Sequence, residues 1–305
     1  SWSGIRDYTN TSSGISDILE GGTIQYAVDD PDDAGAWRNT GVNTASGSTE
    51  FSAEGLADGG HTVYIRGKDA AGNTGIPKGA AFLVDCEGPS GQSVSVLPSS
   101  WTNAREAALS WSGMQDVTGI AHVYYRVDSG EWIDTGVTQG NCTGYQVDIS
   151  ELADGKHRIE VCGEDVLGNM GDPVSVELWT DRAKPENGEV KLLPSAWSCK
   201  DWAEISWSGA MDAISGIAKI EYAIDGGWKD TGSTAPAGSV TADLNRLSDG
   251  IHEVAFRVTD MAGNVSVPVQ MQLRRDTTKP EILIMAPADR AIADGKVQVR
   301  GTVSD

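Results

Sequence analysis

The sequence predicts an all-β chain made of tandem β-sandwich domains in a rod-like array. Two observations predict this fold. An Asp-x-x-Gly-Asn motif recurs three times, ending at Asn73, Asn169 and Asn264, with steps of 96 and 95 residues. Between these motifs, apolar and polar residues alternate in short runs, as in half-buried strands. A step of this length fits one small domain, because common solenoid units are roughly 20–50 residues long.

Two further segments keep the same step. An Asp-Gly-x-His turn ends at His61, His157 and His252, and a Trp-x-x-Thr-Gly segment begins at Trp37, Trp132 and Trp228. The sequence therefore contains three similar copies, and we expect the function to belong to the array.

The boundaries between copies are marked by an aspartate that stands four residues before a proline. These segments are residues 85–89, 181–185 and 276–280, here called the connectors. Proline fixes φ and cannot donate to a ladder, so short connectors of this kind predict a semi-rigid array. We expect domains at residues 1–86, 89–182 and 185–277, and the start of a fourth, truncated β domain at 280–305.

Each complete copy reads as about seven short strands. In the third copy the apolar residues of each run share one parity, as in Ala203, Ile205 and Trp207, while Lys219, Glu221, Glu253 and Arg257 fall on the opposite parity. One buried and one wet face indicate an antiparallel sheet packed on a second sheet. Seven such strands in under a hundred residues predict an immunoglobulin-like sandwich. Core aromatics are expected on the second strand (Trp2, Trp111, Trp207) and on the third (Tyr26, Tyr125, Tyr222).

The first copy departs from this pattern. It begins at the end of its second strand, and so lacks the first strand and most of the second. It also carries two insertions, one within residues 6–13 and one at residues 29–33. Loops on a rigid scaffold often carry binding sites.

The composition excludes several classes of partner. The net charge is −21 and the pI about 4.4, so neither nucleic acid nor an anionic membrane surface is expected to bind. No run approaches the roughly 18 apolar residues of a membrane span. Of the four cysteines, Cys142 and Cys162 are the only two in one copy and form the candidate disulfide, with free thiols as the alternative.

The aspartates of the repeated motif allow two interpretations. The first is turn chemistry, since Asp accepts backbone N–H bonds and Gly and Asn tolerate positive φ. The second is a Ca²⁺ site, because two loops meet at one pole of such a sandwich and bring carboxylates and an amide together. Its candidate ligands are Asp116, Asp165 and Asn169 in the second copy, and Asp212, Asp260 and Asn264 in the third. Two acids per site are few for calcium, so we expect a structural turn that needs no ion and no cofactor.

The insertion at residues 29–33 is a second candidate metal site. Its aspartates are Asp29, Asp30, Asp32 and Asp33. A solvated acidic loop is the simpler interpretation, and any Ca²⁺ bound there is expected to bind weakly because ordering the loop costs entropy.

Candidate ligand-binding residues are aromatic. Trp37, Trp132 and Trp228 either cover the edge of each sandwich, which we favour, or form platforms for sugar rings, and exposure decides between the two. Tyr8 lies in the inserted loop of the first copy. The single histidine in this turn of each copy suggests a packed residue rather than a zinc ligand or a general base, so no enzyme is expected.

These residues carry a family resemblance. The runs Ile220–Trp228, Leu247–His252 and Asp260–Asn264, closed by Asp276–Pro280, resemble the bacterial immunoglobulin-like repeat domains of secreted and cell-surface proteins. The resemblance implies an extracellular, non-catalytic structural or adhesive stalk whose partners are neighbouring domains of a longer chain. The alternatives are a module that binds glycan or a host or cell-surface protein, and an accessory region of a secreted multidomain carbohydrate-active enzyme. Fold alone does not choose among them.

Overall fold

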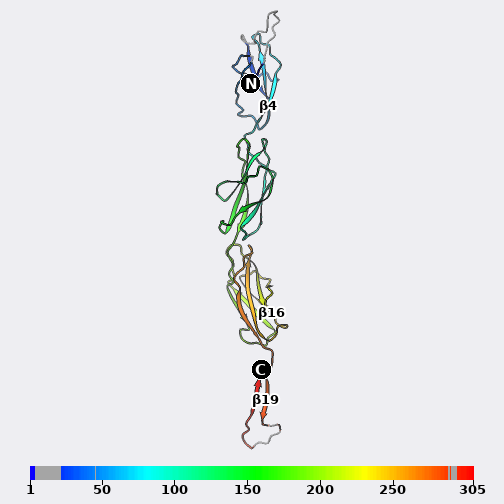
Figure 1. Ribbon diagram of the computed structural model, residues 1–305, viewed down its shortest axis with the longest axis vertical. Helices are drawn as coiled ribbons and strands as arrows, with labels where there is room; N and C mark the ends of the chain where they lie inside the picture. Colours follow the sequence, from blue (N-terminus) through cyan, green and yellow to red (C-terminus); the bar gives the residue numbers. More distant parts are fainter. Residues whose placement is uncertain (4–21, 45, 288, 290–293) are drawn as a thin grey trace. The chain divides into compact units, whose positions relative to one another are not determined.

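The computed structural model describes residues 1–3, 22–44, 46–287, 289 and 294–305, and every helix or strand assigned in them is a β-strand (Figure 1). The prediction of an all-β chain is confirmed. The described strands form six sheets. By its contacts the chain divides into two compact units, residues 1–94, 110–143 and 160–175 and residues 95–109, 144–159 and 176–305, which share the second copy between them.

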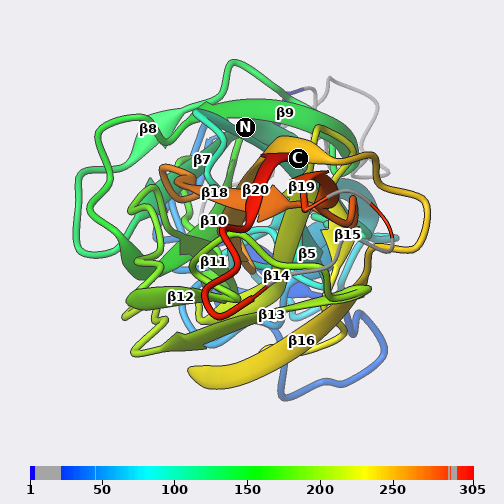
Figure 2. The ribbon, with the colours of Figure 1, turned by 90° about the horizontal axis from the view of Figure 1, so that it is seen from below.

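The third copy is a complete seven-stranded sandwich. Its three-stranded sheet has the order β12-β13-β16, and its four-stranded sheet the order β15-β14-β17-β18. Figure 2 shows β13 and β16 side by side in one layer. The strands are β12 (Glu189–Leu193), β13 (Trp202–Ser208), β14 (Ile217–Ile224), β15 (Lys229–Asp230), β16 (Ala237–Asp243), β17 (Gly250–Asp260) and β18 (Val269–Arg275).

This strand order confirms the immunoglobulin-like sandwich and refines it. The first, second and fifth strands share one sheet, and the third, sixth and seventh share the other. The fourth strand, β15, pairs with the third strand, β14, through Glu221–Asp230 and Tyr222–Lys229. In a constant-type immunoglobulin domain the fourth strand joins the opposite sheet instead.

The core of the third copy lies between its two sheets. Trp207 of β13 contacts Phe256 of β17 across the gap, with ring centres 5.6 Å apart, and Tyr222 is buried beside them. The alternation of the sequence therefore predicts the buried face correctly. The opposite face is not wet throughout, because Glu221 is buried there beneath Lys219 and Arg257, which both bond to its carboxylate, and Ala223 and Thr259 are buried as well.

The second copy has the same strand order. Its sheets are β5-β6-β9 and β11-β10-β7-β8. The strands are β5 (Ser93–Leu97), β6 (Glu106–Ser112), β7 (Ile120–Val127), β8 (Ile133–Asp134), β9 (Cys142–Asp148), β10 (Gly155–Asp165) and β11 (Val174–Thr180). Trp111 and Tyr125 are buried, as predicted, and the Trp111 indole N–H donates to the carbonyl of Gln139 at 3.2 Å.

In the described residues of the first copy one sheet is present, in the order β2-β1-β3-β4. Its strands are β1 (Thr23–Val28), β2 (Arg38–Asn39), β3 (Gly59–Lys68) and β4 (Lys78–Val84). Trp2 pairs with Gly47 through an isolated bridge, at the place where the second strand is expected to end. Trp2 and Tyr26 line the inner face as predicted but are only half-buried, because a cavity of about 800 Å³ opens between them.

In the tail, β19 (Glu281–Ala286) and β20 (Arg300–Ser304) form an antiparallel pair.

All four cysteines are free, so the candidate Cys142–Cys162 disulfide is not formed. Cys142 lies on β9 and Cys162 on β10, which belong to different sheets. Burial raises the pKa of Cys162 to about 11, so this thiol is unreactive.

Candidate functional site

The recurring Asp-x-x-Gly-Asn segment, here called the asparagine turn, is a self-contained hydrogen-bonded turn. In the second copy, Asp165 Oδ1 accepts the backbone N–H groups of Leu167 and Asn169, both at 2.8 Å. Its other oxygen accepts the side-chain amide of Asn169 at 2.8 Å. The pairs Asp69–Asn73 and Asp260–Asn264 repeat this arrangement. Turn chemistry therefore accounts for the residue types of the motif.

The asparagine also reaches beyond its own turn, to the connector that precedes its copy. Asn169 Nδ2 donates to the carbonyl of Asp85 at 3.2 Å, and Asn264 Nδ2 donates to the carbonyl of Asp181 at 2.9 Å. The connector of the second copy also packs closely here, since a Cβ atom on Gly171 would lie 1.9 Å from the carbonyl oxygen of Pro89. The motif thus binds the start of its own copy.

The Asp-Gly-x-His segment, here called the histidine turn, binds the connector that follows its copy. Asp58 accepts the backbone N–H groups of Cys86 and Glu87, at 3.0 and 3.1 Å. Asp154 accepts the N–H of Arg182 at 2.9 Å, and Asp249 accepts the hydroxyl of Thr277 at 2.9 Å. Connectors 85–89 and 181–185 are therefore hydrogen-bonded from both sides.

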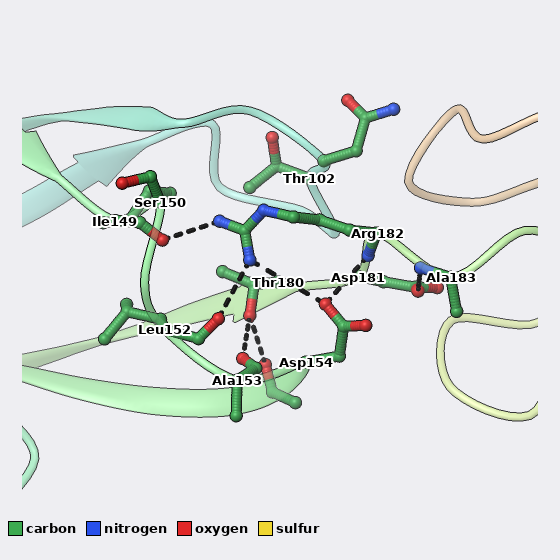
Figure 3. Close-up of polar contacts among 12 residues, drawn as sticks. Thr102, Ile149, Ser150, Leu152, Ala153, Asp154, Thr180, Asp181, Arg182 and Ala183 are labelled. Carbon is green, nitrogen blue, oxygen red and sulfur yellow. Dashed lines mark hydrogen bonds and ion pairs between the residues drawn. The ribbon is translucent and has the colours of Figure 1, made fainter.

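Arg182 closes the histidine turn of the second copy (Figure 3). Its guanidinium donates to the carbonyls of Leu152 at 3.0 Å, Ile149 at 2.6 Å and Ala104 at 3.1 Å. In the third copy Arg275 has this role from a different position, bonding to the carbonyl of Leu247 and pairing with Asp249. The sequence pattern did not reveal this role, because the two arginines are not at equivalent positions.

Replacing Arg182 tests its contribution. Arg182→Ala leaves three carbonyls without their charged donor, and hydrogen bonds to charged groups contribute about 1.5–3 kcal/mol. We expect the free energy of unfolding of the second copy to fall by roughly that amount, measured by urea denaturation. Arg246→Ala removes an exposed arginine and serves as the control, with a change within about 0.5 kcal/mol. Equal changes in both variants would contradict this role.

At two poles the connector adds a third carboxylate to the predicted pair. Among the described residues, carboxylate oxygens lie within 4.8 Å of one another in two groups, Asp85 with Asp116 and Asp165, and Asp181 with Asp212 and Asp260. The repeated motifs and loops predict the latter two of each group, but not Asp85 and Asp181. Their recurrence at the connectors was the available signal, but nothing in the sequence placed a connector against the following pole.

These carboxylates are crowded and poorly solvated. Asp165, Asp181 and Asp260 are buried. Burial raises the pKa of Asp260 above its ordinary value, and the neighbouring charges of Asp181 and Asp212 add to this effect. Asp85 Oδ2 is buried without a hydrogen-bond partner in the described part of the chain. Backbone N–H groups of the loop bond to Oδ1 of Asp212, which leaves its second oxygen for a ligand. A hard cation with oxygen ligands, such as Ca²⁺, fits this donor set.

The acidic insertion of the first copy is arranged differently. Asp30 Oδ1 accepts the N–H groups of Asp32 and Asp33, both at 3.1 Å, and Asp33 Oδ1 accepts the N–H of Gly35 at 2.8 Å. Asp29 pairs with His61 at 2.7 Å. Asp30 and Asp33 therefore cap their own turn, Asp29 pairs with His61 instead, and none of these aspartates belongs to a three-carboxylate group of the described residues.

Each candidate platform tryptophan has an arginine stacked on its ring. The guanidinium carbon lies 3.9–4.4 Å from the ring centre in each copy, with Arg66 over Trp37, Arg126 over Trp132 and Arg257 over Trp228. Trp37 is only 9% exposed, whereas Trp228 is 36% exposed. The burial of Trp37 and the arginine stacked on each of the three rings favour the edge-covering interpretation. Trp197, which is not one of the predicted platforms, is 56% exposed. Tyr8 lies outside the described residues.

The histidines are structural. His61 and His252 place both ring nitrogens within hydrogen-bond distance of protein oxygens, and His157 Nε2 bonds to the carbonyl of Ala153. In His61 and His252 no ring nitrogen is free to act as a general base or to bind zinc. Among the described residues no helix is long and apolar enough to span a membrane.

Comparison with protein families and curated proteins gives one relative. No family model matches the chain. Exoglucanase B of Cellulomonas fimi is 27% identical over 237 residues, which cover 74% of this chain and 21% of that protein. The chain thus spans about a fifth of the length of the curated relative it matches.

Similar solved structures include bacterial adhesins and fibronectin(III)-like modules. A Ca²⁺-stabilized adhesin of an Antarctic bacterium is 17% identical, with 92% of this chain and 71% of that chain covered and a TM-score of 0.39. A 1.5-MDa bacterial ice-binding adhesin is 15% identical, with 86% and 88% covered and a TM-score of 0.41. Fibronectin(III)-like modules of Clostridium thermocellum CbhA are 16% identical, with 60% and 95% covered and a TM-score of 0.37. The fold assignment rests on the strand order of the chain itself.

Proposed function

We propose that this chain is a non-catalytic spacer of a secreted or cell-surface protein, in which tandem sandwiches hold neighbouring domains apart. The observation that carries the proposal is the two-sided binding of the connectors by the histidine turn of one copy and the asparagine turn of the next. A spacer needs connectors that resist bending. The two turns that recur in the copies form hydrogen bonds to the connectors. Both ring nitrogens of His61 and His252 are engaged, which also argues against catalysis.

Limited proteolysis tests whether the connector is closed. The Arg182–Ala183 bond lies in the second connector and is a trypsin site, so its cleavage rate reports local opening. Asn264→Ala removes the hydrogen bond to the Asp181 carbonyl. We expect cleavage after Arg182 to rise about fivefold, which corresponds to roughly 1 kcal/mol for one hydrogen bond.

Asn73→Ala is the matched control for this experiment. It breaks the same turn in the first copy, where Asn73 bonds to Asp69. It should leave cleavage after Arg182 unchanged. Equal rates in wild type and Asn264→Ala would show that the asparagine turn does not hold the connector.

We also propose that the two three-carboxylate groups bind a divalent cation, with Ca²⁺ as the favoured ion. These groups are Asp85 with Asp116 and Asp165, and Asp181 with Asp212 and Asp260. The sequence predicts that the motif needs no ion because each pole has only two acids. In the structure the connector brings a third acid to the pole. Three carboxylates at such short separation repel one another unless a cation offsets their charge. The ion would join the connector to the following copy and so stiffen the same junction.

A second candidate function is an accessory region of a secreted carbohydrate-active enzyme. The observation that favours it is the 27% identity to Exoglucanase B over 74% of this chain. A spacer within such an enzyme would separate its catalytic domain from its other modules. Sequencing the coding region on both sides tests this candidate. A glycosidase domain in the same reading frame would support it, and flanking regions without one would reject it.

A further inference from the structure

Two histidines, His61 at the start of β3 and His252 at the start of β17, occupy the same hydrogen-bonding environment. The Nε2 atom of His61 lies 2.6 Å from the carbonyl oxygen of Ala57, and that of His252 lies 2.9 Å from the carbonyl oxygen of Ser248. The Nδ1 atom of His61 lies 2.7 Å from Asp29 Oδ2. In the third copy, Nδ1 of His252 lies 2.6 Å from Asp225 Oδ2.

Both partners of each ring are acceptors. A neutral imidazole carries one N–H and one lone pair, whereas an imidazolium carries two N–H groups. A carbonyl oxygen can only accept, so Nε2 must carry a proton. A neutral ring would then point the lone pair of Nδ1 at a carboxylate, which is repulsive. The geometry is satisfied when both nitrogens are protonated.

The aspartate is held as the negative partner. Asp29 Oδ1 accepts the N–H of Thr62 at 2.8 Å, and Asp225 Oδ1 accepts the N–H of Glu253 at 3.0 Å. Hydrogen bonds from N–H donors favour the ionised carboxylate. Asp29 and Asp225 also have positive φ values of 64° and 50°, a conformation that favours Asp and Asn among non-glycine residues. The backbone therefore aims each carboxylate at its histidine.

The surroundings offer each imidazole no competing charge partner in the described structure. Across the ladder, His61 faces Phe82 and His252 faces Leu273. The adjacent turn aspartates are engaged elsewhere, since Asp58 binds the connector backbone and Asp249 binds Thr277 and pairs with Arg275.

We propose that His61 is an imidazolium ion in the folded protein and forms a protonation-dependent latch between two turns. The latch ties the end of β1, at Asp29, to the histidine turn, at Ala57, and His252 repeats its hydrogen-bond geometry at Asp225 and Ser248. Deprotonation removes the N–H that the carboxylate accepts and opens the latch. The histidine turn is therefore held while the imidazole is protonated and loosens as the pH rises.

The sign of the pH dependence follows for the first copy. The hydrogen bond to Asp29 raises the pKa of His61 above its ordinary value, and the bond to His61 lowers the pKa of Asp29. A raised histidine pKa gives a stabilisation that is complete below about pH 6.5. It is lost as the pH rises through the folded-state pKa of His61. The lowered pKa of Asp29 adds stabilisation that is lost only in strong acid.

NMR of the whole chain with ¹⁵N-labelled histidine tests the latch, because ring nitrogen shifts distinguish imidazolium from each neutral tautomer. The test variant is Asp29→Asn, which keeps the side-chain shape and suits a positive φ but removes the charge. At about pH 7, where an ordinary histidine is mostly neutral, we expect wild-type His61 to retain both ring protons. Asp29→Asn should lose the second proton from His61, and the matched change Asp225→Asn in the third copy should leave His61 unchanged.

Two results would overturn the proposal. One is a neutral His61 in the wild-type chain at about pH 6.5, the ordinary midpoint, when its turn is folded. The other is an unchanged titration of His61 in Asp29→Asn. The wild-type spectrum decides alone if the variant does not fold. The latch does not depend on the spacer function, so failure of either proposal leaves the other standing.

Discussion

Trp111→Ala is expected to destabilise the second copy by about 3–5 kcal/mol, the range for removing a large core aromatic. Trp111 is 2% exposed on β6, and its indole N–H bonds to the Gln139 carbonyl. The substitution therefore opens a cavity and leaves a carbonyl without its donor. Urea denaturation followed by NMR signals of the second copy measures the effect separately from the other copies.

The control for this prediction is Trp197→Ala. Trp197 is 56% exposed, so its removal should change stability by less than about 1 kcal/mol. The comparison holds residue type constant and varies burial. A small effect at Trp111, or equal effects at both positions, would mean that the buried face of the second strand is assigned wrongly.

Removing calcium is expected to have the second large effect. A ligand that binds only the folded state stabilises it by RT ln(1 + [L]/Kd), about 2.7 kcal/mol at a hundredfold excess over Kd. Millimolar CaCl₂ should therefore raise the melting temperatures of the second and third copies relative to EDTA. The first copy should not respond, because neither three-carboxylate group lies at its asparagine turn.

Charge-removing variants at the connectors provide the control. Asp181→Asn should abolish the calcium response of the third copy alone, and Asp85→Asn that of the second copy alone. Without calcium Asp85→Asn should be at least as stable as wild type, since it relieves repulsion between carboxylates. Melting curves that are identical in EDTA and CaCl₂ would contradict the cation site and leave the turn as a purely hydrogen-bonded structure.

Most of the fold could be predicted from sequence because it depends on local patterns. Alternation places Trp207 and Tyr222 in the core correctly. Asp and Asn at fixed offsets identify the asparagine turn, since the bonds from Asn169 to Asp165 span only four residues.

The site was harder to predict because its parts meet only in three dimensions. Asp181 lies 31 and 79 residues from Asp212 and Asp260, and no periodicity places a connector against the next pole. Arg182 and Arg275 perform one role from different positions. The sequence also does not show that Arg66, on β3, lies over the ring of Trp37 and covers it.

Small-angle X-ray scattering of the whole chain tests the central claim, a spacer with closed connectors, most directly. A compact globule of this length would have a radius of gyration of about 19 Å. Three sandwiches in series, each about as long as its longest strand of 10 or 11 residues, or about 35 Å, should instead give at least about 30 Å. A rod-like profile with that radius is the predicted result. A radius near 19 Å would show that the copies fold back on one another and would contradict the spacer.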